Sequence, residues 1–471
     1  MTQKKVIHWF RQDLRLLDNP AFSYAAQQGK IIPVYILDNY HGVEYTPGAA
    51  SRLWLYHALH ALNHTLEGKL LTYTGNPENI LLNLIKQHNI KAVYWNRCYE
   101  PWQITRDKHI KTMLNAQGIE VRSFNSFLLW EPWDILNDKG LPYRVFTPFY
   151  QKSLLNAPEP RKPVLSIPKF MLVQDSLEKT DIDAHSLLPI LRWDLPLIEH
   201  WQVSEQGAQA RFAHFLADNL ANYQKQRDFP AAQQVSRLSP YLHFGQISPN
   251  QLWHSALASR SDVNSEHFCR ELAWREFSYH LLYYFPNLRY QNFQQKFDNF
   301  PWDSNPDKLR RWQRGQTGFP LIDAGMRELW KTGYMHNRVR MVVGSFLVKN
   351  LLLDWRYGER WFWDCLLDAD LANNSVSWQW VAGCGADAVP YFRVFNPITQ
   401  SEKFDPDGLY IRRFVPELEK LPTRYLFSPW NAPDSVLKAS GVMLGKTYPY
   451  PIVDIKQTRQ QALDIFAKLK K

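Results

Sequence analysis

Residues 355–397 read WRYGERWFWDCLLDADLANNSVSWQWVAGCGADAVPYFRVFNP. This stretch combines five tryptophans with two closely spaced carboxylates, Asp368 and Asp370, and a tandem amide, Asn373 and Asn374. Polar groups placed among apolar residues are costly to bury unless they have hydrogen-bond partners. The stretch therefore predicts a site for a large ligand that is both polar and aromatic.

On both sides of this stretch the apolar residues recur at helical spacing, and strand-like alternation is scarce. This pattern predicts a large all-α domain over residues 206–471. The expected helices span residues 207–223, 267–283, 320–330, 335–353 and 361–367.

The first 130 residues have a different organisation, in which short β-rich runs alternate with helical patterns such as residues 50–66 and 77–88. Alternation of this kind predicts an α/β domain with a doubly wound parallel sheet over residues 1–130. Residues 131–205 are rich in proline and predict a long connector. The expected strands are residues 6–10, 31–37, 70–74, 92–95 and 121–124.

Three local patterns resemble well-known ligand-binding motifs, but none of them meets the requirements of the motif it resembles. The segment RQDLRLLDN after the first expected strand has no G-x-G-x-x-G, so it is not an ordinary dinucleotide-binding turn. Residues 441–447 have only three residues between their glycines, and prolines follow, which argues against a phosphate loop. His57, His60 and His64 share a helical face, but no carboxylate or cysteine joins them in the sequence, and an exposed polar face explains them.

Composition restricts the classes of binding partner and the cellular compartment that the sequence predicts. The 471 residues carry a net charge of +10, which fits an anionic partner such as nucleic acid, although many basic proteins bind none. The four cysteines are scattered, which argues against disulfides or a zinc site. Without a signal peptide pattern or a bilayer-length apolar run, the sequence predicts a cytoplasmic protein with no membrane contact.

Three further stretches have unusual polar content. The segment YQKQRDFPAAQQVSRLSP, residues 223–240, offers hydroxyls and a guanidinium that suit a phosphate, although an ordinary helix cap explains them too. On helices, Glu271, Trp274 and Arg275 of ELAWREF share a face, and so do Asn337, Arg340 and Met341 of GYMHNRVRM. A flat, redox-active, phosphorylated ligand would use such groups together.

Taken together, these motifs resemble the photolyase/cryptochrome family of flavoproteins, and most closely its bacterial class I cyclobutane pyrimidine dimer photolyases. The resemblance runs along the whole chain in one order. It rests on HWFRQDLRLLDNP, YEPW, YRVFTPF, QRDFP, SRLSPYLHFGQISP, ELAWREF, TGFPLIDAGMREL, GYMHNRVRMVVGSFLVK, WQWVAGCGADAVPYFRVFNP and KFDPDGLYIRRFVPEL.

The resemblance implies that the helical domain binds FAD, which is active as FADH⁻. Val235 stands where close relatives usually have Thr, so one hydroxyl is missing there. The amide of Asn374 would lie at flavin nitrogen-5. The residues implied in cofactor binding are Tyr223, Val235, Ser236, Arg237, Leu238, Ser239, Glu271, Arg275, Asn337, Arg340, Asp368, Asp370 and Asn374.

The resemblance also implies light-driven repair of a thymine dimer that is flipped out of single- or double-stranded DNA. Trp274 and Trp380 would stack on the two bases, and Glu271, Asn337 and Met341 would line the rest of the pocket. Trp378, Trp355 and Trp302 would form a relay that photoreduces oxidised FAD. Basic residues matched to DNA phosphates are Arg227, Arg338, Arg393 and Lys403. No obligatory protein partner is implied, and the protein is expected to be a monomer.

Three features bear on the type of family member. Cryptochromes usually carry long C-terminal tails, plant-type photoreceptors have Asp where Asn374 stands, and (6-4) photolyases have a histidine in the motif that here reads NRVRM. All three favour dimer repair. The alternatives are a (6-4) photolyase or a light-sensing flavoprotein.

A second, antenna chromophore has no assigned identity. Trp102 and Gln103 replace the Asn-Glu pair of folate-binding relatives, so deazaflavin, FMN, folate or none remain open.

Overall fold

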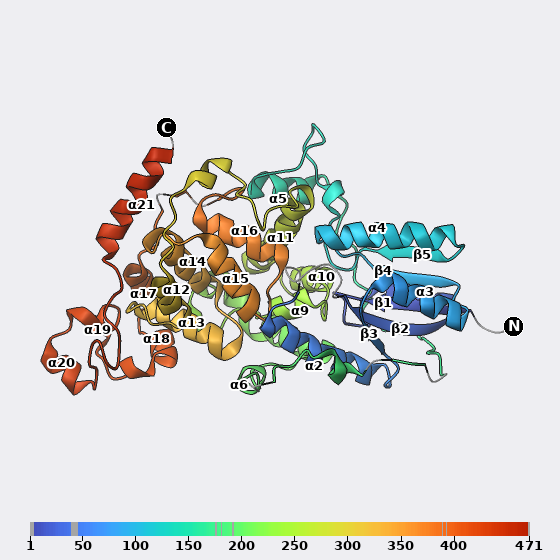
Figure 1. Cartoon of the computed structure of the whole chain (residues 1–471), viewed down its shortest axis with the longest axis horizontal. Coiled ribbons are helices and arrows are strands. Elements are labelled where there is room, and N and C mark those ends of the chain that lie inside the picture. Colours follow the sequence, from blue (N-terminus) through green and yellow to red (C-terminus); the bar gives the residue numbers. More distant parts are fainter. Residues whose placement is uncertain are drawn as a thin grey trace. The chain divides into compact units, whose positions relative to one another are not determined.

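The computed structural model divides the chain into two compact units, drawn together in Figure 1. Unit 1 comprises residues 1–221 and 236–286, and unit 2 comprises residues 222–235 and 287–471. This division follows packing, and the expected domain boundaries at 130 and 205 stay predictions. The structure describes residues 4–38, 46–174, 177–179, 181–190, 193–388, 390–391 and 393–469.

A five-stranded parallel sheet organises unit 1, with the strand order β3-β2-β1-β4-β5. Val6 on β1 pairs with Ile31 on β2 on one side and with Ala92 on β4 on the other. The order reverses between β1 and β4, as in a doubly wound sheet, so the predicted fold class is confirmed. The strands are β1 (Lys5–Phe10), β2 (Lys30–Leu37), β3 (Leu71–Thr74), β4 (Ala92–Asn96) and β5 (Glu120–Phe124).

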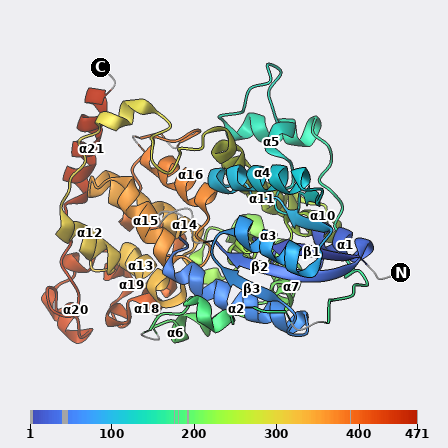
Figure 2. The same cartoon turned by 45° about the vertical axis from the view of Figure 1, so that its right-hand side comes forward.

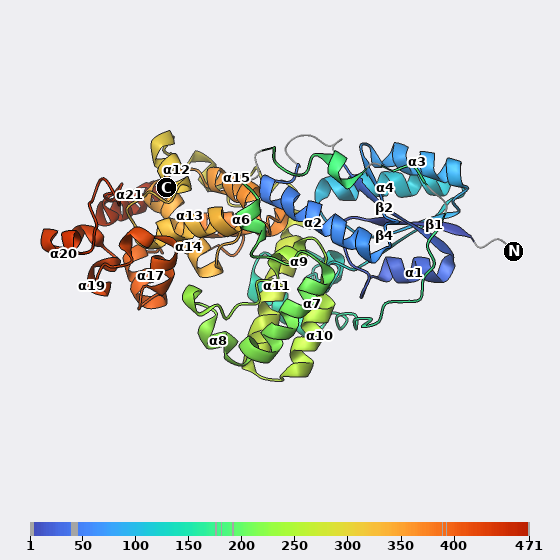
Figure 3. The same cartoon turned by 90° about the horizontal axis from the view of Figure 1, so that it is seen from below.

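Helices cover both faces of this sheet: α1 lies on one face, and α3 and α4 lie on the other (Figure 3). Local sequence starts several of them, because Asn19 and Asn76 cap α1 and α3 and a proline follows each cap. The core between the layers is aliphatic and aromatic, with Ile7, Trp9 and Val93 fully buried. The helices are α1 (Pro20–Gln28), α2 (Ala49–Thr65), α3 (Pro77–His88) and α4 (Pro101–Ala116).

The segment RQDLRLLDN after β1 joins the sheet to the helical part of unit 1. Arg15 is fully buried, and its guanidinium donates to the carbonyl oxygens of Leu17, Asp18, Ser126 and Gly245. Buried cations need such saturation by acceptors. The motif therefore has a structural explanation in this fold.

The rest of unit 1 is the proline-rich connector and a group of helices. Figure 3 shows α7, α10 and α11 close together. The longest is α11, which begins with a capping box formed by Asp262 and Ser265. The elements are η2 (Pro132–Asp134), α5 (Phe146–Leu155), η3 (Ile182–His185), α6 (Leu195–Ile198), α7 (Glu205–His214), η4 (Phe215–Asn219), η5 (Leu220–Asn222, which crosses the boundary between the units), α9 (Ser239–His243), α10 (Pro249–Ser259) and α11 (Val263–Tyr284).

Unit 2 is helical, with α14, α15 and α16 adjacent in Figure 2. The helix expected over 361–367 begins earlier, at Trp355, because Asp354 caps it there. The unit contains α8 (Tyr223–Gln226), η6 (Pro230–Ala232), η7 (Gln295–Asn299), α12 (Pro306–Gln313), α13 (Pro320–Thr332), α14 (Asn337–Ser345), η8 (Phe346–Asn350), α15 (Trp355–Cys365), α16 (Leu371–Ala382), α17 (Pro397–Phe404), α18 (Leu409–Phe414), η9 (Pro416–Leu418), α19 (Thr423–Leu426), η10 (Pro429–Asn431), α20 (Asp434–Ala439) and α21 (Ile455–Leu469).

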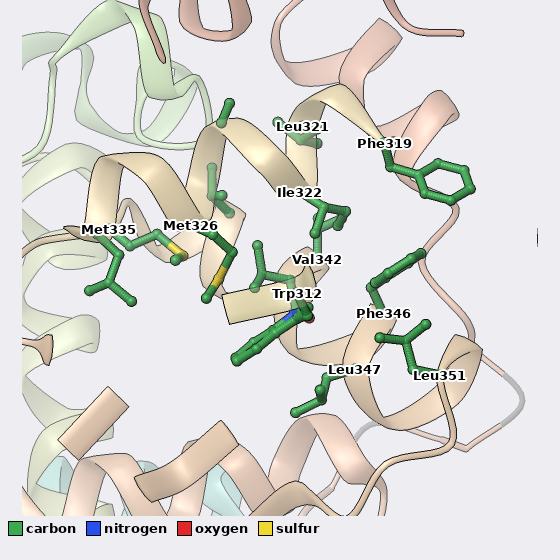
Figure 4. Close-up of a cluster of buried hydrophobic side chains, with 14 of the residues drawn as sticks. Trp312, Phe319, Leu321, Ile322, Met326, Met335, Val342, Phe346, Leu347 and Leu351 are labelled. Atoms are coloured by element: carbon green, nitrogen blue, oxygen red, sulfur yellow. The ribbon is translucent and has the colours of Figure 1, made fainter. Parts of the chain in front are cut away.

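Figure 4 shows part of the core of unit 2, where α13, α14 and η8 meet around Trp312. The Trp312 ring is fully buried, and its Nε1 donates to the carbonyl oxygen of Val343 at 3.2 Å. A buried indole N–H needs such an acceptor. This core holds α14 in place, and α14 carries several of the expected site residues.

The histidine group on α2 differs from expectation in one respect, because a carboxylate does approach it. Asp183 Oδ1 lies 3.4 Å from His60 Nε2 and accepts a hydrogen bond from the Tyr56 hydroxyl at 2.6 Å. Even so, no cluster of His, Cys, Asp and Glu in the described parts of the chain could hold a metal ion. Within the same residues no helix is both long and apolar enough to cross a bilayer.

Candidate functional site

The N-terminus of α16 is set by Asp370, whose Oδ1 accepts from the backbone N–H of Asn373 and from its side-chain amide, both at 2.8 Å. Asn373 is therefore used locally. Its neighbour Asn374 lies about 100° further around the helix and is buried. Of the two adjacent asparagines, Asn373 therefore stabilises the start of the helix, whereas the side chain of Asn374 takes no part in this cap.

Asn374 is oriented by Glu359 of α15. Its Nδ2 donates to the Glu359 carbonyl oxygen at 3.0 Å and to Oε1 at 3.2 Å. Burial raises the pKa of Glu359, while Arg289, 3.5 Å away, acts in the opposite direction. Because both bonds use the amide nitrogen, Oδ1 is the atom of Asn374 left to accept a hydrogen bond from a ligand.

Arg340 and Asp368 form a second polar pair in unit 2. Arg340 Nη2 donates to Asp368 Oδ2 at 2.9 Å, and Arg340 Nε donates to the Met335 carbonyl oxygen at 2.7 Å. Asp368 Oδ1 is buried and has no hydrogen-bond partner within the described residues. A buried acceptor without a donor is unusual and fits a site that a ligand N–H or hydroxyl completes.

The first turn of α14 carries Asn337 and Met341, four residues apart on one side. Asn337 is exposed and Met341 is partly exposed, as a substrate-facing pair would be. His336, just before them, accepts from the Arg338 N–H through Nδ1 and so caps the helix. Burial lowers the pKa of His336 to about 4, so this histidine is neutral at physiological pH.

Arg338 is held by two neighbours from other segments of unit 2. Its Nη2 lies 2.6 Å from Asp228 Oδ2, and its guanidinium lies 4.4 Å from the ring centre of Phe404. The other expected DNA-binding cations are Arg227, placed 5.3 Å from the Tyr223 ring, and the exposed Arg393 and Lys403. Each of these four cations is at least partly accessible.

The outer member of the expected tryptophan relay, Trp302, is more exposed to solvent than the two inner members. Trp378 and Trp355 are buried, whereas Trp302 is partly exposed and packs on Phe300 at 4.2 Å between ring centres. Gly358 explains how α15 approaches Trp378, because a Cβ there would lie 2.1 Å from the Trp378 ring. Trp380, two residues on, is partly exposed.

In unit 1, α11 presents Trp274 and Glu271, both partly exposed. The Trp274 ring stacks on Phe146 with centres 3.7 Å apart and an interplanar angle of 8°. A rigid stacked ring is suited to receive a flat base on its other face. Phe146 comes from the YRVFTPF motif, which contributed to the family resemblance but had no residue with an expected role.

Arg275 behaves differently from its expected role in cofactor binding. Its Nη1 donates to the Phe127 carbonyl oxygen at 2.9 Å and to Glu276 Oε1 at 3.0 Å. Glu276 in turn accepts from the Leu129 N–H at 2.7 Å, and burial raises the pKa of Glu276 to about 7. In this structure Arg275 anchors the segment around residues 127–130, and its cofactor contact stays a prediction.

The expected phosphate-binding residues are divided between the two units, with Ser236 to Ser239 in unit 1 and Tyr223 and Val235 in unit 2. Arg237 has a left-handed backbone with a φ of 52°, and its guanidinium lies 4.9 Å from the Trp201 ring. Ser236 is partly exposed and Ser239 is exposed, whereas Leu238 is buried. In unit 2, Val235 is partly exposed and Tyr223 is buried.

The carboxyl edge of the sheet, where doubly wound folds bind ligands, is occupied by ion pairs. Arg106 Nη1 lies 2.9 Å from Asp38 Oδ2, and Asp107 accepts from both Arg106 and Arg11, at 2.8 and 2.9 Å. These four residues satisfy one another's charges, so this edge does not identify an antenna chromophore.

Of the two residues that replace the folate-binding pair, Trp102 is bound by its neighbours. Trp102 Nε1 donates to Glu100 Oε2 at 2.8 Å, and its ring lies 5.0 Å from the Arg106 guanidinium. Gln103 is buried. The antenna therefore stays without an assigned identity.

Comparisons with known proteins identify the family of this chain. Residues 6–166 match the family model for DNA photolyase, and residues 268–468 match that for the FAD binding domain of DNA photolyase. A deoxyribodipyrimidine photo-lyase of Agrobacterium fabrum is 46% identical over 99% of this chain and 98% of its own length. The chain belongs to the photolyase/cryptochrome family.

Two other relatives bear on the subgroup. Cryptochrome-2 of Arabidopsis thaliana is 38% identical over 97% of this chain and 78% of its own length. A crystal structure of a bacterial class III photolyase from Agrobacterium tumefaciens has a TM-score of 0.95 at 45% identity, covering 100% of this chain and 98% of that one.

These matches confirm the expected family and fold, and the photo-lyase names confirm the expected enzyme class. The expected class I subclass stays a prediction, because one similar solved structure is that of a bacterial class III photolyase. The matched motifs mark the family as a whole and do not separate its classes.

Glu359, Asp228 and Phe146 were not identified from the sequence. For Glu359 a signal existed: Trp355, Glu359 and Phe362 have the spacing of one buried helix face, and a carboxylate on such a face indicates a polar partner.

Proposed function

We propose that this protein is a class III-type photolyase that uses FAD and light to repair cyclobutane pyrimidine dimers in DNA. The observation that carries the proposal is the orientation of Asn374, whose Nδ2 is bound to Glu359 so that Oδ1 is left as an acceptor. An amide oxygen suits the N–H at nitrogen-5 of a reduced flavin, whereas a titratable carboxylate would not hold one protonation state.

The residues present fit this cofactor. Asp368 Oδ1 lacks a donor within the described residues, and a ribose hydroxyl or an adenine amino group supplies one. Arg340 fixes the other oxygen of Asp368 at 2.9 Å. When bound and reduced, FAD supplies a light-excited electron that splits the dimer and then returns, while the protein holds Asn374, Asp368 and Arg340 in place.

Substrate recognition is proposed for Trp274, Glu271, Asn337, Met341 and Trp380. Each assignment is supported by features within its own unit. In unit 1, the Trp274 ring stacks on Phe146 at 3.7 Å. In unit 2, Asn337 and Met341 occupy one side of α14 that is at least partly exposed. Arg227, Arg338, Arg393 and Lys403 are proposed to bind DNA phosphates, which fits the net charge of +10.

Two alternatives share this fold. A (6-4) photolyase needs a reactive histidine beside the dimer, but His336 is turned to cap α14 and is buried. A light sensor of the plant cryptochrome type is suggested by the 38% identity to cryptochrome-2, but Asn374 stands where those photoreceptors have Asp. Both observations favour dimer repair.

The test is a comparison of substrates. Protein with reduced flavin is illuminated with two matched oligonucleotides, one containing a cyclobutane dimer and the other a (6-4) photoproduct. Repair of the first alone is expected. Repair of the second alone would assign (6-4) activity, and repair of neither would favour light sensing.

A further inference from the structure

A chain of hydrogen bonds links the buried ring of Trp355 to a carboxylate at the surface of unit 2. The Trp355 side chain is fully buried, and its Nε1 donates to Asn292 Oδ1 at 2.9 Å. Asn292 Nδ2 donates in turn to Asp298 Oδ1 at 2.7 Å. Asn292 is buried, whereas Asp298 is exposed.

The donors and acceptors available determine the direction of each hydrogen bond in this series. An indole nitrogen can only donate, so the Asn292 oxygen must face Trp355 and the Asn292 NH₂ must face Asp298. The negative charge on Asp298 polarises the amide between them and makes its oxygen a stronger acceptor. The charge is therefore felt at the indole N–H even though the carboxylate lies outside the core.

The other charged group on Trp355 acts in the opposite sense. The Arg356 guanidinium lies 4.7 Å from the Trp355 ring centre, where it disfavours positive charge on the ring. Its own charge is offset by Asp354, with Arg356 Nη1 3.0 Å from Asp354 Oδ2. Of these two contacts, the hydrogen bond that Trp355 Nε1 donates to Asn292 is thus the one that favours positive charge on the ring.

We propose that Asn292 and Asp298 stabilise the radical cation of Trp355 during flavin photoreduction, as positioning residues of the relay. The inference rests on the proposed function and on the expected tryptophan relay, in which light-excited oxidised FAD would be the initial oxidant. One electron passes from Trp355 to the Trp378 radical cation, so Trp378 becomes neutral and Trp355 carries the positive charge. The indole proton stays on Nε1, because an amide oxygen is too weak a base to remove it.

The test replaces Asp298 by asparagine. Asp298→Asn keeps an oxygen at the same place and removes the charge, and an exposed position tolerates the change. Asp407→Asn is the matched control, because Asp407 is also an exposed aspartate of unit 2 and has no bond to a relay tryptophan in the described residues. Transient absorption after a light pulse on oxidised, FAD-loaded protein measures the yield of long-lived tryptophan radicals.

We expect Asp298→Asn to lower that yield about three- to tenfold, the range given by the difference in strength between a hydrogen bond to a charged group and one to a neutral group. It should also shift the Trp355 indole N–H resonance in the ¹H–¹⁵N spectrum, a change that needs no bound flavin. The melting temperature and the control variant should match the wild-type protein. A wild-type radical yield in folded Asp298→Asn would overturn the inference.

Trp355→Phe separates this inference from the proposed relay. If Trp355→Phe photoreduces FAD as fast as wild type, the relay itself is wrong, and the inference falls with it. If Trp355→Phe blocks photoreduction but Asp298→Asn has the wild-type yield, only the role of Asn292 and Asp298 is wrong.

Discussion

The side-chain amide of Asn374 is held by Glu359 through two hydrogen bonds. Asn374 Nδ2 donates to the Glu359 carbonyl oxygen at 3.0 Å and to Glu359 Oε1 at 3.2 Å. The backbone bond alone would leave the amide nitrogen with one acceptor, and the carboxylate supplies the second. The residue that faces the flavin in our proposal is thus oriented by one that does not.

Replacement of Glu359 by leucine should loosen that orientation. The variant removes one of the two acceptors of Asn374 Nδ2 and the partner of Arg289, and it should lower the free energy of unfolding by about 1–3 kcal/mol. The reduced flavin should reoxidise faster in air, which its absorption spectrum measures. Unchanged reoxidation in a folded, FAD-loaded variant would show that Glu359 does not act through Asn374.

Trp274→Ala tests the proposed base-stacking platform. The variant removes the ring that stacks on Phe146 at 3.7 Å, and it should weaken binding to dimer-containing DNA about 5- to 150-fold, the value of one lost base stack. FAD content should be unchanged. Trp330→Ala is the control, since Trp330 is a tryptophan exposed at 67% that belongs to no proposed substrate contact. Wild-type affinity in Trp274→Ala would refute the pocket assignment.

Arg338 and Asp228 give paired predictions for DNA binding. Arg338→Gln should weaken binding to all sequences and reduce the dependence of log affinity on log salt by about 1. Asp228→Asn should have the opposite effect on affinity, because the carboxylate 2.6 Å from Arg338 competes with a phosphate. Fluorescence anisotropy at several salt concentrations measures both. Equal slopes in wild type and Arg338→Gln would exclude a phosphate contact.

Trp302→Phe tests the outer end of the relay. Trp302 is partly exposed, so its loss should block photoreduction of oxidised FAD with external reductant. Repair by the chemically reduced variant should remain at the wild-type level, because that step does not use the relay. Loss of repair in the pre-reduced variant would assign Trp302 another role.

Glu276 should make the stability of unit 1 depend on pH. Burial raises its pKa from 4.5 to about 7, so between these values the folded protein keeps a proton that the unfolded chain has lost. The free energy of unfolding should therefore fall as pH rises from about 4.5 to about 7, by up to about 3 kcal/mol from this group. Glu276→Gln should remove that contribution.

Denaturant titrations at several pH values measure this dependence. Glu266→Gln serves as the control, because Glu266 is exposed on the first turn of the same helix. The same pH dependence in wild type and Glu276→Gln would contradict the prediction.

The elements of the sheet could be predicted from the sequence because each buried strand is a short apolar run between turn residues, as in Ile31 to Leu37. The start of α15 was misplaced because its N-cap, Asp354, precedes a tryptophan-rich turn whose periodicity is hard to see. Capping chemistry, more than hydrophobic spacing, fixes that boundary.

The candidate site was predictable mainly as a set of residue types and much less as a set of contacts. Asp368, Asp370 and Asn374 stand out because polar groups interrupt an apolar stretch. The role of Asp228 depends on a partner far along the chain, Arg338, which is 110 residues away. Such pairs carry no local signal, because tertiary packing brings them together.

The most direct test of dimer repair is the recovery of thymine absorbance in UV-irradiated oligothymidine mixed with the protein after its flavin has been reduced. We predict recovery under near-UV or blue light and none in the dark. No recovery under light, with FAD bound and reduced, would contradict the account.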